Sequence, residues 1–192
     1  MVAEGTGDAE CVRRVQQGHI DTFEVLVRRY EKPIFNLAYR LLGDYDEAAE
    51  VTQDVFLSAF KSLHQFRGEA NFSTWLYRIG LNHASTRRKN MNSTQRRHLP
   101  LDGTEVIAGG AADPAKSVES KEIQQRVQEA LNTLNAEDAR IILLRDLQDI
   151  SYEKVAAMLE IPVGTVKSRL HRARQALRNS LAPYFHANRK AS

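Results

Sequence analysis

The sequence predicts an all-α protein built from two small helical domains. Apolar residues recur at spacings of three and four over long stretches, which is typical of amphipathic helices. Helix breakers are few, with only five Pro and ten Gly in 192 residues. The periodicity is lost once, between residues 91 and 117, and this loss divides the chain. The hydrophobic fraction of 42% is sufficient for a packed core.

The first predicted domain covers residues 9–90 and contains four helices. These are expected over about 9–17, 21–42 and 46–63, and from Asn71 or Ser73 to about Lys89. Asp21 suits the N-cap of the second helix, and Gly43 suits its end. Its apolar stripe comprises Phe23, Leu26, Val27, Tyr30, Ile34, Leu37, Ala38 and Leu41.

Residues 91–117 are expected to form a flexible linker. This segment contains Asn-Ser-Thr, Asp-Gly, Gly-Gly and Asp-Pro, which are turn and loop combinations. A structureless stretch of about 25 residues is longer than a compact domain normally contains. The second domain is therefore placed at 118–184, with helices near 118–133, 137–146, 152–159 and 163–181.

A helix-turn-helix is predicted within this second domain, over about 152–171. Ser151 suits the N-cap of its first helix, and Glu160-Ile161-Pro162 forms the turn. If Glu160 is left-handed, a position that Gly often holds, its backbone is strained by about 1 kcal/mol. In the second helix one stripe faces inward, namely Val163, Val166, Leu170, Ala173 and Leu177.

The opposite side of that helix presents donors without a carboxylate, as a surface that reads the major groove requires. It consists of Lys167, Ser168, His171 and Arg172. An ordinary helical hairpin with a basic outer face is the structural alternative.

Charge is unevenly distributed, although the net charge is only +3. Residues 151–192 carry eight bases against two acids, and residues 86–97 carry five bases and no acid. Residues 44–54 instead carry five acids and no base. Two basic zones suggest two contacts with a polyanion. The acidic zone would repel DNA. We expect it either to contact a protein surface that is basic or polar, or to be a solvated face without a partner.

The predicted fourth helix places Arg78, Asn82, Ser85 and Lys89 on one stripe, with Trp75 at its edge. Phe66, Arg67, Asn71 and Phe72 precede it in a loop-like stretch. Donors beside exposed aromatic rings suit stacking and hydrogen bonding of unpaired bases. The alternative, that Trp75 and Phe72 belong to the core, stays open.

Enzymatic chemistry has little support. The single cysteine excludes a disulfide framework and a cysteine-based zinc site, and the six His are scattered. No Gly-rich phosphate loop or metal-ligand spacing occurs. We therefore expect no catalytic residue, metal, cofactor or small-molecule substrate. With no apolar segment of signal-peptide or membrane-span type, a cytoplasmic protein is expected.

Three blocks resemble the extracytoplasmic-function sigma factors, group-four members of the bacterial sigma-70 family, of the envelope-stress (sigma-E-like) type. These are DEAAEVTQDVFLSAF at 46–60, FRGEANFSTWLYRIGLN at 66–82 and LQDISYEKVAAMLEIPVGTVKSRLHRAR at 147–174. The resemblance runs from about Val12 to Pro183. It implies that 9–90 is sigma region 2 and 118–184 is sigma region 4.

The resemblance also implies a role for each block. Helix 46–60 would bind the β′ clamp of core RNA polymerase through Glu50, Gln53, Asp54 and Leu57. Region 2 would read and melt the −10 element through Phe66, Asn71, Phe72, Trp75, Arg78, Asn82, Arg87 and Arg88. Region 4 would read the −35 element through Thr165, Lys167, Ser168, His171 and Arg172.

The expected partners are core RNA polymerase (the β′ clamp and the β subunit), promoter DNA and an anti-sigma factor, which in this family is often membrane-anchored. The alternative function is a dimeric helix-turn-helix transcriptional regulator with an N-terminal sensor domain. The acidic helix 46–60 and the basic-aromatic stretch 66–89 favour the sigma factor, because a repressor needs neither.

Overall fold

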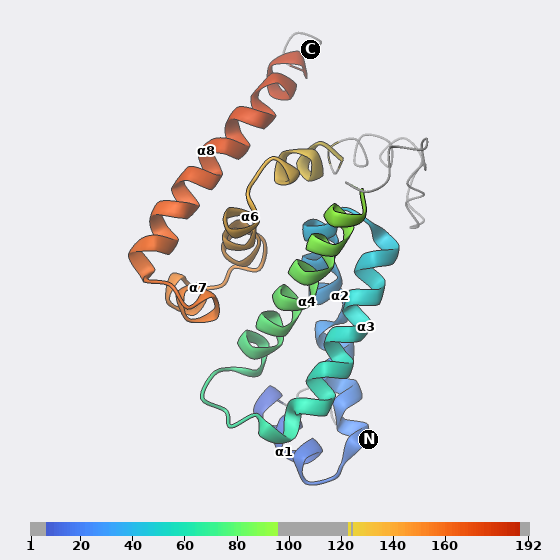
Figure 1. The fold of residues 1–192 in the computed structure, drawn as a ribbon. Helices are drawn as coiled ribbons and strands as arrows, with labels where there is room; N and C mark the ends of the chain where they lie inside the picture. Colours follow the sequence, from blue (N-terminus) through green and yellow to red (C-terminus); the bar gives the residue numbers. More distant parts are fainter. Residues whose placement is uncertain (1–6, 96–122, 124, 189–192) are drawn as a thin grey trace.

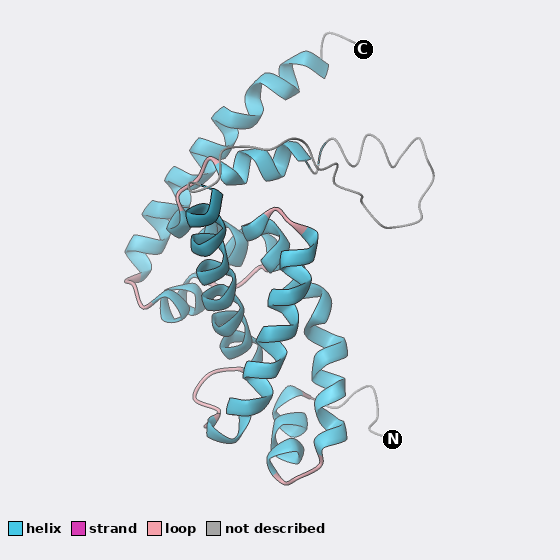
Figure 2. Cartoon of the chain, turned by 45° about the vertical axis from the view of Figure 1, so that its right-hand side comes forward, coloured by secondary structure: helices cyan, strands magenta, loops and turns pink. Residues whose placement is uncertain are grey.

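The structure is a computed structural model that describes residues 7–95, 123 and 125–188. Helices joined by short loops make up this part of the chain, and no strand occurs within it (Figure 2). The all-α prediction is confirmed for these residues. Of the expected linker, residues 96–117 lie outside the described ranges, whereas residues 91–95 belong to a helix.

Four main helices form the first domain, namely α1 (Asp8–Gln16), α2 (Phe23–Leu42), α3 (Tyr45–Ser62) and α4 (Phe72–Gln95). Helices α2, α3 and α4 pack side by side as a bundle, and α1 closes one end (Figure 1). Gly80 on α4 allows close approach to α2. A Cβ at that position would lie 3.4 Å from Leu37 Cδ2 and 3.5 Å from Ile34 Cδ1.

Local capping sets most helix boundaries in this domain. Gly43 ends α2 in the left-handed conformation, with φ of 76°, as predicted. The Asp44 carboxylate then caps α3 by accepting the Glu47 N–H at 2.9 Å. The expected N-cap at Asp21 is wrong, because Asp21 lies in a 3₁₀ turn, η1 (Ile20–Thr22), and α2 begins at Phe23.

The second domain begins with a helical segment over 125–132, followed by α6 (Ala136–Ile142). A π turn, η3 (Leu143–Leu147), connects α6 to α7 (Tyr152–Leu159), and α8 (Val163–Asn188) completes the chain. The Asn135 side chain caps α6 by accepting the Asp138 N–H at 2.9 Å. Helix α8 extends beyond the predicted end at residue 181 and includes Pro183.

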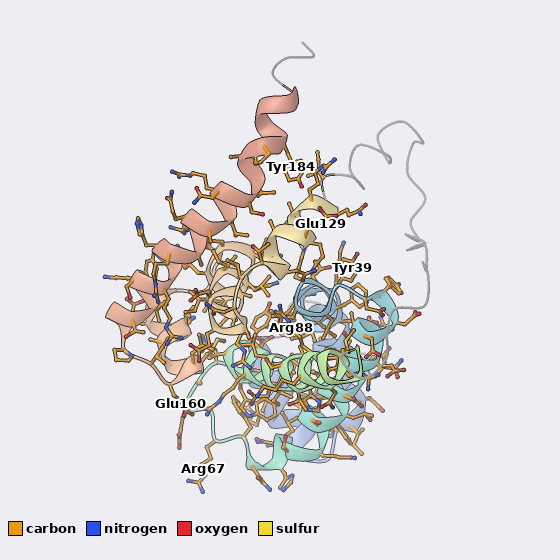
Figure 3. The ribbon with its side chains drawn as sticks, turned by 45° about the horizontal axis from the view of Figure 1, so that its top comes forward. Tyr39, Arg67, Arg88, Glu129, Glu160 and Tyr184 are labelled. Atoms are coloured by element: carbon orange, nitrogen blue, oxygen red, sulfur yellow. The ribbon has the colours of Figure 1, made fainter. Side chains whose placement is uncertain are left out.

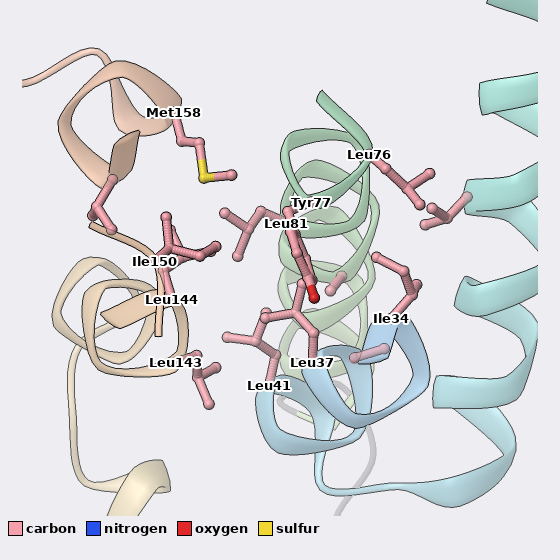
Figure 4. Packing of buried hydrophobic residues seen from close by; sticks show 14 of the residues in the cluster. Ile34, Leu37, Leu41, Leu76, Tyr77, Leu81, Leu143, Leu144, Ile150 and Met158 are labelled. Carbon is pink, nitrogen blue, oxygen red and sulfur yellow. The ribbon is translucent and has the colours of Figure 1, made fainter. Parts of the chain in front are cut away.

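The two domains share one hydrophobic core. Leu144, Ile150 and Met158 of the second domain face Tyr77 and Leu81 of the first (Figure 4), and all five are buried. Polar contacts cross the same boundary. The Tyr77 hydroxyl donates to Gln148 Oε1 at 2.8 Å, Arg140 Nε donates to Ser85 Oγ at 2.9 Å, and Gln128 Nε2 donates to the Arg40 carbonyl at 3.0 Å. The described structure is therefore a closed arrangement of the domains.

Candidate nucleic-acid and protein interfaces

The helix-turn-helix is formed by α7, its turn and the start of α8. The Ser151 hydroxyl accepts the Lys154 N–H at 3.4 Å, so the predicted cap is present. Glu160 adopts φ of 55°, so the turn residue is left-handed. The predicted stripe packs inward: Val166, Leu170 and Ala173 are buried, and Val163 and Leu177 are half-buried.

The outer face of α8 is open to solvent. Lys167, Ser168, His171 and Arg172 are all exposed, and Thr165 is half-buried in the first turn of the helix. Two other cations of α8 serve the fold instead: Arg169 pairs with Glu137, and Arg174 Nη2 lies 2.6 Å from Asp146 Oδ1. The cations on the outer face form no ion pair within the described part of the chain.

The aromatic residues of the first domain form a cluster at the start of α4. The Trp75 ring is half-buried, with its centroid 5.0 Å from that of Phe66 and 5.8 Å from that of Phe72. Phe72 is only 3% exposed, which agrees with the alternative that it belongs to the core. Its ring supports Trp75 from the core. Asn71 is exposed beside it.

Two candidate residues further along α4 have different surroundings. Arg78 forms an ion pair with Glu160, the left-handed residue of the helix-turn-helix turn. Asn82 is exposed and lines an open cavity of about 350 Å³ together with Asp54, His83 and Arg87. The His83 Nε2 lies 3.0 Å from Ser58 Oγ, which connects this wall of the cavity to α3.

Arg87 connects the basic helix α4 to the acidic helix α3. Its guanidinium pairs with Glu47, and its Nη2 lies 2.5 Å from Glu50 Oε2. The hydrogen bond to Glu47 raises the pKa of Arg87 above its ordinary value. Arg88, the next residue, is half-buried at the boundary with the second domain (Figure 3). The two neighbouring cations therefore lie in different surroundings.

The exposed face of α3 carries the residues expected to bind a protein. Glu50, Gln53 and Asp54 are exposed, and Leu57 is 56% exposed among them. Phe60 on the same helix is 39% exposed, with its ring centroid 5.1 Å from that of Phe23. The acidic face therefore has a larger apolar component than the sequence indicated.

Sequence reasoning missed the contacts that join distant segments. Arg140, Gln148 and Glu160 were not candidates, yet each bonds to a residue of α4. No local sequence pattern predicts such pairs, because the partners are more than 50 residues apart in the sequence. Within the described ranges, no group of three or more His, Cys, Asp or Glu could hold a metal ion. The helices described there include none with the length and apolarity needed to cross a membrane.

Two family models match the chain, one for each domain. The model "Sigma-70 region 2" matches residues 26–93, and the model "Sigma-70, region 4" matches residues 124–177. Each match lies largely within one of the two domains expected from the sequence, and together the models cover more than half of the chain.

Curated relatives match along almost the whole length. The ECF RNA polymerase sigma-E factor of Escherichia coli K12 is 36% identical, over 95% of this chain and 98% of the relative. The RNA polymerase sigma-H factor of Pseudomonas aeruginosa is 35% identical, over 92% of this chain and 94% of the relative.

Solved structures show the same fold. CnrH, in complex with the cytosolic domain of CnrY, matches with a TM-score of 0.69 and 22% identity, over 90% of this chain and 96% of that one. The sigma factor RpoE of Bartonella quintana, in complex with the anti-sigma factor NepR, matches with a TM-score of 0.64 and 24% identity. This match covers 83% of this chain and 96% of that one. With both family regions present in order and this identity over nearly its full length, the chain belongs to the extracytoplasmic-function sigma factors of the sigma-70 family.

Proposed function

We propose that this chain divides promoter recognition between its two domains, and that polymerase binding is carried by a third surface on α3. As a sigma factor it binds core RNA polymerase and directs it to promoters. The observation that carries the division of roles is the orientation of α8. Its apolar stripe is buried against α6 and α7, and the donor-rich side is left exposed.

For the −35 element, we assign base contacts to Lys167, Ser168, His171 and Arg172, because they share the exposed face of a helix that suits the major groove. Thr165 lies near the helix N-terminus, where the backbone N–H groups favour a phosphate. Each bidentate contact between an arginine and a guanine is worth about 1–3 kcal/mol of discrimination.

For the −10 element, we assign stacking to Trp75 and Phe66, and polar contacts to Asn71, Arg78, Asn82, Arg87 and Arg88. In the closed arrangement Arg78 is paired with Glu160 and Arg87 with Glu47 and Glu50. Binding of a −10 strand therefore requires both arginines to leave their carboxylate partners and to pair with phosphates of the strand. This exchange is possible because both arginines are partly exposed.

For the polymerase, we assign contacts to Glu50, Gln53, Asp54 and Leu57 on α3, with the β′ clamp as the partner and a further contact between region 4 and the β subunit. The chain performs no catalysis in this proposal and works in the cytoplasm with the polymerase. An anti-sigma factor, which can be membrane-anchored, is proposed as its inhibitor by analogy with the structural neighbour RpoE, which was solved in complex with the anti-sigma factor NepR.

The proposal is tested by adding the full chain to core polymerase and to a set of candidate promoters. We expect the chain to co-purify with core polymerase and to give promoter-dependent transcripts. Failure of both would contradict the proposal. The dimeric regulator is not favoured, because regions 2 and 4 both match and such a regulator requires neither α3 nor the aromatic cluster.

A further inference from the structure

A basic cavity lies between the two domains, and of its lining residues the proposed function uses only Arg88, as a −10 contact. Its volume is about 260 Å³. The first domain contributes Leu41, Ser85, Arg88 and Lys89, and the second contributes Leu134 and Arg140. The site therefore exists as a unit only while the domains are closed.

The charge of this cavity is not compensated. Three cations line it, namely Arg88, Lys89 and Arg140, and the described residues of its lining include no carboxylate. Other arginines at domain or helix contacts do pair with acids, as Arg78, Arg87 and Arg174 show. Within the described part of the chain, the three cavity cations form no ion pair. A surface arranged in this way favours an anion.

Arg140 is held in place by one edge of its guanidinium. Its Nε donates to Ser85 Oγ at 2.9 Å, and the Ser85 hydroxyl donates in turn to the Leu81 carbonyl. The two Nη groups of Arg140 form no hydrogen bond with another described residue. They therefore remain available as a pair of donors whose orientation is already fixed.

We propose that this cavity binds a small phosphate-type anion, and that the bound anion holds the two domains together. Guanidinium and ammonium groups bind phosphate oxygens through charge-assisted hydrogen bonds. Leu41 and Leu134 supply apolar walls that lower the local dielectric and strengthen these interactions. The volume is below the roughly 300–1,000 Å³ of sites for drug-sized ligands, so it suits inorganic phosphate or pyrophosphate.

Binding of the anion is coupled to the equilibrium between the closed and open arrangements of the domains. Because both domains contribute cations, the anion binds the closed arrangement better than an open one, and the equilibrium shifts toward closure by that difference in affinity. Such a ligand would oppose the separation of Arg78 from Glu160, and it would reduce access to the −10 surface.

The test uses the full chain, inorganic pyrophosphate as the probe, calorimetry and thermal denaturation at constant ionic strength. We expect saturable one-to-one binding and a higher Tm. Arg140→Gln and Lys89→Gln should each weaken binding about tenfold, whereas Arg178→Gln, on the exposed surface of α8, should leave it unchanged. Lys89 forms no hydrogen bond with another described residue, so its variant remains informative if Arg140→Gln fails to fold.

Three results would overturn the proposal. The first is the absence of saturable binding, and the second is an equal loss of affinity in Arg178→Gln. The third comes from a single-stranded oligonucleotide without promoter sequence. If it displaces pyrophosphate and its own binding falls equally in Arg140→Gln, the cavity serves nucleic-acid phosphates. Neither calorimetry nor thermal denaturation depends on transcription, so these outcomes are independent of the proposed function.

Discussion

The guanidinium of Arg78 on α4 forms an ion pair with the carboxylate of Glu160 in the turn of the helix-turn-helix. A residue proposed to bind the −10 strand is thus neutralised by the domain that reads the −35 element. Glu160 holds this position with φ of 55°, a conformation that costs a non-glycine residue about 1 kcal/mol. The pair is therefore maintained at a strained site on the boundary between the domains.

Replacement of Glu160 by Asn removes the ion pair with Arg78 and at the same time relieves the backbone strain at this position. Asn adopts the left-handed conformation more readily than Glu, whereas loss of an exposed ion pair costs about 0.2–1 kcal/mol. In Glu160→Asn these effects oppose each other, so the free energy of unfolding should change by less than about 1 kcal/mol. The free protein should bind a −10 single strand several-fold more tightly, because Arg78 is released. Fluorescence anisotropy with a labelled strand measures this gain.

The control for this change is Glu31→Gln, which removes an exposed carboxylate of α2. It alters the net charge by the same amount. An equal gain in affinity for both variants would show that net charge, and not the release of Arg78, is responsible.

The shared core predicts that the two domains unfold together. Leu81 is 2% exposed and lies at the contact with Ile150 and Met158. Leu81→Ala should lower the free energy of unfolding by about 2–5 kcal/mol. Fluorescence of Trp75, the single tryptophan, reports on the first domain, and far-ultraviolet circular dichroism reports on both. The two signals should shift to one lower Tm, and two separate transitions would contradict the shared core.

Alkaline pH should destabilise the chain through two tyrosines. Burial raises the pKa of Tyr77, and burial together with the hydrogen bond to Asp8 raises the pKa of Tyr30. The folded chain therefore keeps these protons at a pH at which the unfolded chain has lost them. Stability should be unaffected below about pH 10, the ordinary pKa of tyrosine, and should fall as the pH rises above it.

Tyr77→Phe tests the contribution of the residue at the domain boundary. This variant removes the hydrogen bond to Gln148, which should cost about 1 kcal/mol at neutral pH. It should also reduce the loss of stability above pH 10, as measured by urea denaturation at several pH values. Tyr45→Phe, at a tyrosine that is 53% exposed, is the matched control.

Charge reversal on α3 tests the proposed polymerase surface. Asp54→Lys should weaken binding to core polymerase several-fold, because an exposed carboxylate that meets a basic partner becomes a like charge. Binding of isolated −35 duplex DNA should be unchanged by comparison with Glu31→Lys, a matched reversal on α2. Fluorescence titration with core polymerase and with the duplex measures both affinities, and equal loss of both would refute the separation of roles.

Helix periodicity and capping predicted most of the fold from the sequence. The stripe containing Val166 and Leu170 is buried, and the stops at Gly43 and Glu160 are in the left-handed conformation. Boundaries without a strong local signal were less accurate. Helix α4 is described as far as Gln95, beyond the predicted end at about Lys89.

The candidate site was less predictable, because burial and pairing depend on distant segments. Phe72 is in the core and Phe60 is partly exposed, although both lie in amphipathic patterns that allow either position. The pairing of Arg87 with Glu47 and Glu50 follows only from the packing of α3 against α4. The closed domain arrangement was equally outside the reach of the sequence, since a linker of this length permits many placements.

Transcription by the reconstituted holoenzyme on a library with separately randomised −35 and −10 elements tests the division of roles most directly. The account predicts that Arg172→Ala relaxes selection at one or two −35 positions, by about 1–3 kcal/mol of discrimination, and leaves −10 selection intact. Asn82→Ala should relax −10 selection alone. Relaxation of both elements by either variant, or selection of neither element by the unaltered chain, would contradict the account.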